Sequence, residues 1–195
     1  MAAKSLVQEV AIETKGRGYI ATEPISRGVL VFEEEPLAFA VSDGMTEKVC
    51  NECLDIPKKL YSCSKCKFAR YCGKHCQREA WKVHKSECVR MQSTSPPYYK
   101  KSICLFGRLI DKLDSRQESP IRDLLSNPNK TLRPELESEI RLNTYLLTQT
   151  YVDRELDMQF FDQLMGQYRR NCFGLQDKGF IDMAAASLFS KSYYF

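Results

Sequence analysis

The residues best suited to chemistry in this chain are seven cysteines and one histidine, crowded into the 39 positions from 50 to 88. They fall into four pairs with two or three residues between partners: Cys50/Cys53, Cys63/Cys66, Cys72/Cys76 and His84/Cys88. At such spacing one turn can aim both side chains at a single ion. Four pairs supply the eight ligands of two closed tetrahedral sites. The block is therefore predicted to bind two Zn²⁺ ions in a structural role.

Zinc is favoured over an iron–sulfur cluster because one site of four cysteines and one of three cysteines and a histidine suit it better. His75 adjoins Cys76 but is out of phase with the pairs, so it is not predicted to be a ligand. Spacing does not decide which pairs share an ion. Consecutive pairing would group the first pair with the second, whereas interleaved pairing would group the first with the third and the second with the fourth.

The overall composition is that of a soluble globular protein, with 43% apolar and 28% charged residues. No apolar run approaches the ~18–20 residues needed to span a bilayer, so no membrane association is expected. The N-terminus lacks the apolar core of a secretory signal. The expected location is nucleus and cytoplasm, where cysteines more often serve metals than disulfides.

The net charge of the chain gives little support for nucleic-acid binding. Seven thiolates and two Zn²⁺ ions together change the formal charge by −3, from +4 to near +1. Residues 50–90 are more basic, with ten Lys or Arg against four Asp or Glu, or about +3 after the same correction. Such a surface could attract DNA or acidic peptides, or could be an ordinary solvated face.

The elements that must hold the cysteine block are predicted to form an α+β fold. Short strands at Val7–Ile12, Val29–Phe32 and Leu37–Val41, separated by turns at 16–18 and 26–28, suggest a small β meander. A linker is expected at 93–97, where two prolines follow each other.

Beyond Tyr98 the apolar residues recur at helical spacing, which predicts a mainly helical segment. Pro134 is expected in the first turn of the second helix. The three apolar stripes are Ile103, Phe106, Leu109, Ile110 and Leu113; Leu136, Ile140, Asn143 and Leu147; and Phe160, Phe161, Leu164, Met165 and Tyr168. All three are interpreted as packing faces.

Several residues around the ligands give the block a family likeness. With Tyr71-Cys72, Gln77, Ala80-Trp81 and His84-Lys85-x2-Cys88, it resembles a MYND finger. The resemblance implies interleaved zinc sites, Cys50/Cys53/Cys72/Cys76 and Cys63/Cys66/His84/Cys88. It also implies protein partners, in particular proline-rich peptides.

The flanking sequence resembles the split start of a SET domain. The matching segments are Lys15-Gly16-Arg17-Gly18-Tyr19, Ile25-x2-Gly28-x-Leu30 and Glu35-Pro36-Leu37-Ala38. Over about residues 5–175 the order of parts is similar to that of the SET-and-MYND (SMYD) protein-lysine methyltransferases. The implied division is the N-terminal part of a split SET domain at 1–48, the finger at 50–88, and the helical SET insert with the beginning of the core SET at 92–178. Residues 179–195 form a tail without assignment.

The same resemblance assigns residues to S-adenosylmethionine. Lys15, Gly16 and Arg17 match the loop that contacts this cofactor, where glycine lets the backbone approach the ligand. Asn127 and Asn171 match two further contact positions.

The sequence departs from the family in its catalytic motifs. Both histidines of the chain are in the block, so the Asn-His motif is absent. Cys104 and Cys172 alone remain outside the block, too few for a third zinc site. No residue is assigned as catalytic, because nothing supports a role for Tyr193 or Tyr194.

The expectation is therefore a SMYD-like zinc-finger protein, truncated and catalytically incomplete, that acts through its finger in protein interaction. An adaptor whose flanks only support partner binding is a second interpretation. The alternative is an active methyltransferase that modifies lysines of histones or other proteins and regulates transcription. In an incomplete domain, strand edges and apolar helix faces would be exposed, which predicts aggregation or oligomers.

Overall fold

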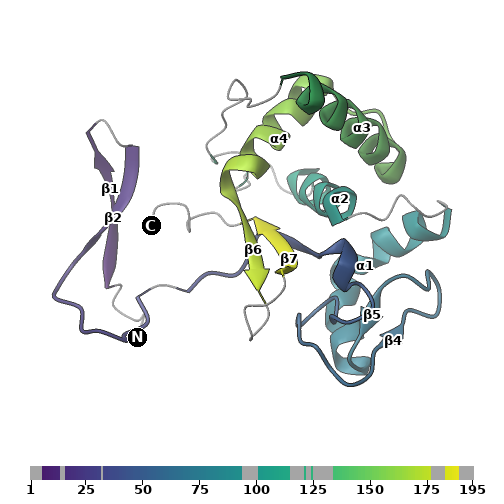
Figure 1. The fold of residues 1–195 in the computed structure, drawn as a ribbon, viewed down its shortest axis with the longest axis horizontal. Helices are drawn as coiled ribbons and strands as arrows, with labels where there is room; N and C mark the ends of the chain where they lie inside the picture. The colour runs from purple at the N-terminus through teal and green to yellow at the C-terminus, as the bar shows by residue number, and fades with distance from the viewer. Residues whose placement is uncertain are drawn as a thin grey trace.

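The computed structural model describes residues 6–13, 16–31, 33–93, 101–114, 121, 124, 134–176 and 183–188. These residues form an α+β structure, as the sequence predicted (Figure 1). In chain order its elements are β1 (Val7–Ile12), β2 (Gly16–Ala21), β3 (Ala38–Val41), a 3-10 turn (Asp43–Met45), β4 (Tyr61–Ser62), β5 (Arg70–Tyr71), α1 (Lys74–Ser93), α2 (Lys101–Asp114), α3 (Pro134–Val152), α4 (Met158–Asn171), β6 (Cys172–Gln176) and β7 (Met183–Leu188).

β1 and β2 form an antiparallel hairpin that lies apart from the other elements (Figure 1). β1 has the bounds predicted for the first strand. The segment 16–18, predicted as a turn, is instead the beginning of β2. A Cβ atom on Gly18 would lie 2.7 Å from the side chain of Ile12, so the glycine makes room for a cross-strand neighbour. Glycine therefore marks a close approach here rather than a turn.

The predicted strand at Val29–Phe32 is wrong for its described residues. Residues 29–31 are irregular, and Phe32 lies outside the described residues. Val29 is 46% exposed and Leu30 is 70% exposed. β-propensity reflects packing against neighbouring strands, and the described chain supplies no partner strand at this point. β3 does form within the predicted range 37–41, but no meander connects it to the hairpin.

A three-stranded antiparallel sheet has the order β3-β7-β6 (Figure 1). Its central strand, β7, comes from the C-terminal stretch for which the sequence predicted no element. β7 pairs with β3 from Ala38↔Leu188 to Val41↔Ala185, and with β6 on its other side. One edge of β3, which was expected to be exposed, is therefore paired with β7.

Helices α2, α3 and α4, here called the helical body, enclose the main apolar core. The five stripe residues predicted for α2 are all at most 6% exposed. In α4, Phe161, Leu164 and Met165 are buried and Phe160 and Tyr168 pack partly against them. Their apolar faces are therefore covered, contrary to the exposure expected.

The predicted stripe of α3 is only partly correct, although Pro134 does begin the helix. Asn143 is exposed and Leu147 is half-buried, while the side chains of Leu136 and Ile140 lie outside the described set. Among the side chains of α3 that the structure describes, those of Thr148, Tyr151 and Val152 are buried. This face of α3 packs on α2 because the Tyr151 ring fits against Gly107. A Cβ atom on Gly107 would lie only 2.6 Å from that ring.

In the described part of the chain, no helix combines the length and the apolar composition required to cross a lipid bilayer. The predicted linker begins with Ser93, which is the last residue of α1, and 94–97 lie outside the described residues.

Candidate metal centre

Two turns of the same shape each present a cysteine pair. In the first, Leu54 donates its backbone N–H to the carbonyl of Cys50 at 3.1 Å; in the second, Lys67 donates to the carbonyl of Cys63 at 3.0 Å. Leu54 and Lys67 have φ angles of 59° and 61°, the left-handed conformation that tightens each turn. The two segments are therefore structurally equivalent zinc knuckles.

The remaining four ligands are presented by helix α1 and the residues just before it. The second knuckle connects β4 to β5, and β5 leads the chain to Cys72. Cys72 itself precedes the helix, whereas Cys76 lies in its first turn. His84 and Cys88 lie one turn apart on the same face of α1.

The structure brings the eight candidate ligands together in two interleaved groups. Within each group the ligand atoms all lie within 4.8 Å of one another. The groups are Cys50, Cys53, Cys72 and Cys76, and Cys63, Cys66, His84 and Cys88. His75 is exposed and belongs to neither group. This is the grouping that the family resemblance implied and that spacing alone left open.

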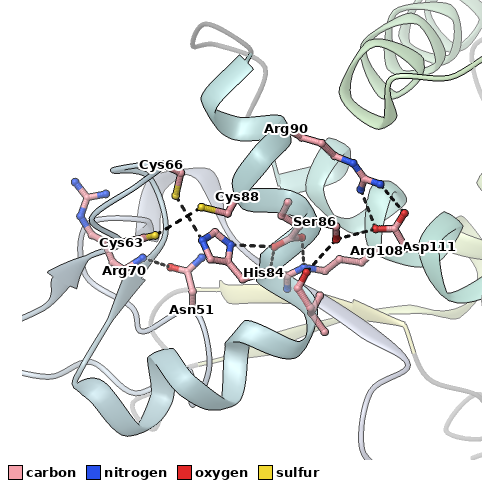
Figure 2. Close-up of polar contacts among 12 residues, drawn as sticks. Asn51, Cys63, Cys66, Arg70, His84, Ser86, Cys88, Arg90, Arg108 and Asp111 are labelled. Carbon is pink, nitrogen blue, oxygen red and sulfur yellow. Dashed lines mark hydrogen bonds and ion pairs between the residues drawn. The ribbon is translucent and has the colours of Figure 1, made fainter.

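The separations between ligand atoms fit a tetrahedral zinc site. With Zn–S bonds of about 2.3 Å, two sulfurs of a tetrahedron lie roughly 3.8 Å apart. The Sγ atoms of Cys63 and Cys88 are 3.8 Å apart, those of Cys53 and Cys72 3.7 Å apart. Cys66 Sγ lies 3.5 Å from Nε2 of His84 (Figure 2). Each group thus has the donors and spacing of a closed structural zinc site.

The surroundings of the candidate ligands lower the pKa of some thiols and raise the pKa of others. Burial would raise the pKa of Cys63, but hydrogen bonds from the Cys66 backbone and from His84 outweigh it and lower that pKa to about 6. For Cys88, burial and the neighbouring Cys63 and Cys66 raise the pKa to about 12. Four crowded ligands cannot all be deprotonated unless a cation offsets their mutual repulsion.

The apolar core around the ligands is small. It contains Ala69, Tyr71 and Ala80 with the buried cysteines, and Trp81 and Leu60 pack partly against it. The Asn51 side chain adds a polar link, since its Oδ1 accepts a hydrogen bond from the Arg70 backbone at 3.1 Å (Figure 2).

A surface cavity of about 330 Å³ adjoins the second group. It is lined by Cys63, Ser64, Lys65, Gln77, Arg78 and Trp81. The Trp81 ring packs edge-on against His84 with centroids 5.9 Å apart, and Lys65 Nζ lies 5.7 Å from the centre of the same ring. Trp81, which lines the cavity, is therefore in contact with a candidate zinc ligand, His84.

The residues expected to contact S-adenosylmethionine do not form a site among the described residues. Lys15 and Asn127 lie outside them. Gly16 and Arg17 belong to β2, in the hairpin that lies apart from α4 (Figure 1). Asn171, the last residue of α4, is fully buried and donates from its side-chain amide to the carbonyl of Gln167 at 2.6 Å.

Sequence reasoning missed two charged residues beside the second group. Glu87, between His84 and Cys88 in sequence, is 1% exposed and forms an ion pair with Arg108 of α2. Burial would raise the pKa of Glu87, but the charge of Arg108, the His84 imidazole 3.5 Å away and the hydrogen bonds from Arg108 lower it to about 2. The position of a carboxylate three residues after a ligand histidine was the available signal.

Comparison with known proteins adds the family. Residues 50–88 match the family model described as MYND finger. The chain is 38% identical over 130 residues to histone-lysine N-methyltransferase SMYD3 of Homo sapiens, covering 64% of this chain and 30% of that protein. It is 27% identical over 191 residues to histone-lysine N-methyltransferase Smyd1 of Mus musculus, covering 94% of this chain and 39% of that protein.

A yeast protein extends the comparison. The SET domain and MYND-type zinc finger protein 6 of Schizosaccharomyces pombe is 28% identical over 108 residues, covering 55% of this chain and 22% of that protein. The chain thus spans between about a fifth and two fifths of the length of these relatives. Two clusters of zinc-type ligands, the MYND finger match and these relatives together support a protein of the SET-and-MYND (SMYD) family.

Proposed function

We propose that this chain acts through its MYND finger as a protein-interaction module that binds proline-rich peptides. The observation that carries the proposal is the cavity beside Trp81. Proline-rich segments form extended helices with little conformational entropy to lose, and they dock in grooves lined by aromatic rings. Trp81 supplies such a ring, and Gln77 and Ser64 supply polar groups for the exposed carbonyls of a peptide backbone.

The charges at the cavity favour a peptide with acidic neighbours. Lys65 and Arg78 both line it, and the metallated finger carries a net charge of about +3. A proline-rich peptide that contains an acidic residue should therefore bind more tightly than a neutral one, and the difference should be larger at low salt. DNA is the other partner that a basic finger could attract, and no described contact favours it.

The single tryptophan of the chain makes the proposal testable directly. We expect an acidic proline-rich peptide to change Trp81 fluorescence, while the same peptide with alanine for proline does not. By calorimetry, Trp81→Ala should weaken binding by roughly 30-fold, because loss of a central aromatic anchor costs about 2 kcal/mol. Tyr61→Ala is the matched control, since that ring lies elsewhere on the finger and is 53% exposed.

A specific result would contradict peptide binding. If a DNA duplex changes Trp81 fluorescence with a steep salt dependence and no peptide does so, the finger is a nucleic-acid site instead. If both zinc-loaded variants bind the peptide equally, the cavity is not the binding site.

We also propose that these 195 residues do not transfer methyl groups by themselves. The relatives are named histone-lysine methyltransferases, but the motifs that the family resemblance assigns to catalysis are absent from this sequence. Of the residues assigned to S-adenosylmethionine that the structure describes, Gly16 and Arg17 lie in β2 and Asn171 lies in α4. Incubation with labelled S-adenosylmethionine and a histone mixture should give no labelled protein, and labelling above the level of a heat-treated control would favour the active enzyme.

A further inference from the structure

Helix α1 carries three candidate ligands of the finger, Cys76, His84 and Cys88, and its second half also contacts α2. Glu87 lies in this second half, with its carboxylate buried between two basic side chains. Arg108 of α2 donates to it twice, from Nε at 2.5 Å and from Nη2 at 3.1 Å. On the other side, Nδ1 of His84 lies 3.5 Å from Oε2 of Glu87.

The imidazole of His84 therefore has its two nitrogens in different surroundings. Nε2 lies among the ligand atoms, near Cys66. Nδ1 is buried, and in the described part of the chain it makes no hydrogen bond of standard length. The Glu87 carboxylate is the acceptor that faces it. A carboxylate in this position fixes the tautomer and orientation of a histidine that binds zinc through its other nitrogen.

Arg108 continues the same set of contacts into the sheet. Its third nitrogen, Nη1, donates to the backbone carbonyl of Phe39 in β3. The guanidinium also lies 5.6 Å from the centre of the Phe39 ring. Since the Arg108 side chain is 14% exposed and that of Glu87 only 1%, these contacts run through the interior, from a zinc ligand to a strand of the sheet.

We propose that Glu87 is a positioning residue that couples the Cys63/Cys66/His84/Cys88 zinc site to the attachment of the finger on β3. It orients His84 for the metal and holds Arg108 against the Phe39 carbonyl. Metal binding at this site therefore stabilises the contact between finger and sheet. Near the Cys50/Cys53/Cys72/Cys76 site, Glu52 interacts with Arg108 through its charge, but the hydrogen bonds of Arg108 in the described structure go to Glu87 and Phe39 and not to that site. We therefore expect this site to be coupled more weakly to β3.

A second ion pair between the same helices provides the control. Arg90 donates to both carboxylate oxygens of Asp111, at 2.8 and 2.7 Å (Figure 2). This pair joins α1 to α2 but is partly exposed, and Asp111 accepts its hydrogen bonds from Arg90 and Ser86, neither of which is a zinc ligand. A variant of Asp111 therefore tests helix contact without touching the zinc site.

The first test measures zinc release from each site separately. A competing chelator is added to the zinc-loaded full chain, and mass spectrometry of alkylated cysteines shows which group has opened. We expect Glu87→Leu to weaken zinc binding by 10- to 100-fold at the His84 site alone, the usual effect of losing such a partner. Glu87→Gln, which keeps an acceptor for Nδ1, should restore part of the loss. Asp111→Leu should leave both sites unchanged.

A spectroscopic measurement distinguishes orientation of His84 from general stability. In the cadmium-loaded chain, Glu87→Gln should shift the ¹¹³Cd resonance of the site with one nitrogen ligand and leave that of the four-sulfur site in place. Equal weakening of both sites by Glu87→Leu, or no resonance shift in Glu87→Gln, would overturn the positioning role.

The coupling itself is tested on the unmodified chain, so that a variant that fails to fold cannot obscure the result. Hydrogen exchange is followed as chelator removes zinc from one site and then the other. Amide protection in β3 and around Arg108 should fall in the step that exposes Cys63, Cys66 and Cys88 to alkylation. Protection of β3 that persists after that step would overturn the proposal.

Discussion

The MYND finger and the helical body bury residues of different chemical kinds. In the finger, three of the six residues of the buried cluster are cysteines, Cys50, Cys63 and Cys88, and the others are Ala69, Tyr71 and Ala80. In the helical body, rings and aliphatic chains pack on one another, with Phe106 and Phe161 at a centroid distance of 5.3 Å. A segment of some forty residues buries too little apolar surface to offset its chain entropy. The finger is thus organised around ligands for metal, and the body around apolar contact.

The largest effect should come from removing a zinc ligand. We expect Cys63→Ser to unfold the finger, because structural zinc contributes about 10–16 kcal/mol of apparent binding energy to small fingers. The helical body should keep its structure. Limited proteolysis with mass spectrometry would show cleavage within 50–88 and protection of 134–176.

Cys172→Ser is the control for this change, since that thiol lies in β6 outside both ligand groups. A finger that stays resistant to protease after its zinc has been removed and measured would contradict the comparison.

A smaller effect is expected in the helical body. Phe161 is fully buried, and its ring packs on Phe106 and on Tyr145 at 5.5 Å. Phe161→Ala should lower the free energy of unfolding by about 3–5 kcal/mol, measured by urea denaturation of the body. The variant should still bind two zinc ions. Leu142→Ala, at a site 49% exposed, should change stability little. Loss of zinc from Phe161→Ala would show that the finger requires an intact apolar core in the body in order to bind metal.

The smallest effect concerns one atom in α2. Gly107→Ala would ordinarily favour a helix by about 1 kcal/mol, yet the new Cβ would meet the Tyr151 ring at 2.6 Å. We expect net destabilisation of about 1–3 kcal/mol from overpacking, seen as a lower melting temperature. Gly73→Ala has nothing within 4 Å and serves as control. If Gly107→Ala stabilises the chain, the Tyr151 ring does not define the packing of α3.

The features that local spacing controls were open to prediction from sequence. The cysteine pairs and the apolar faces of α2 and α4 repeat over a few residues, so the pattern shows them directly. The grouping of the pairs required a family resemblance, because two arrangements satisfy the same spacing. Burial of α3 depended on Tyr151 fitting against a glycine of another helix, and no repeat within α3 reveals that.

Contacts between segments that are distant in the chain could not be predicted from the sequence. The pair Glu87–Arg108 joins two helices, and each residue alone resembles an ordinary charged surface position. Met183–Leu188 contains three alanines in a row and carries a weak strand signal. Its position between β3 and β6 follows from backbone pairing, which a single sequence does not encode locally.

The central position of β7 also sets an order of events during synthesis. β3 emerges from the ribosome about 145 residues before the strand that pairs with it. At roughly 5–20 residues per second, this delay is roughly 7 to 30 seconds. The finger ligands span only 39 residues, so the finger can take up zinc during this interval. Through Arg108, a finger already metallated would hold β3 in place until its partner strand arrives.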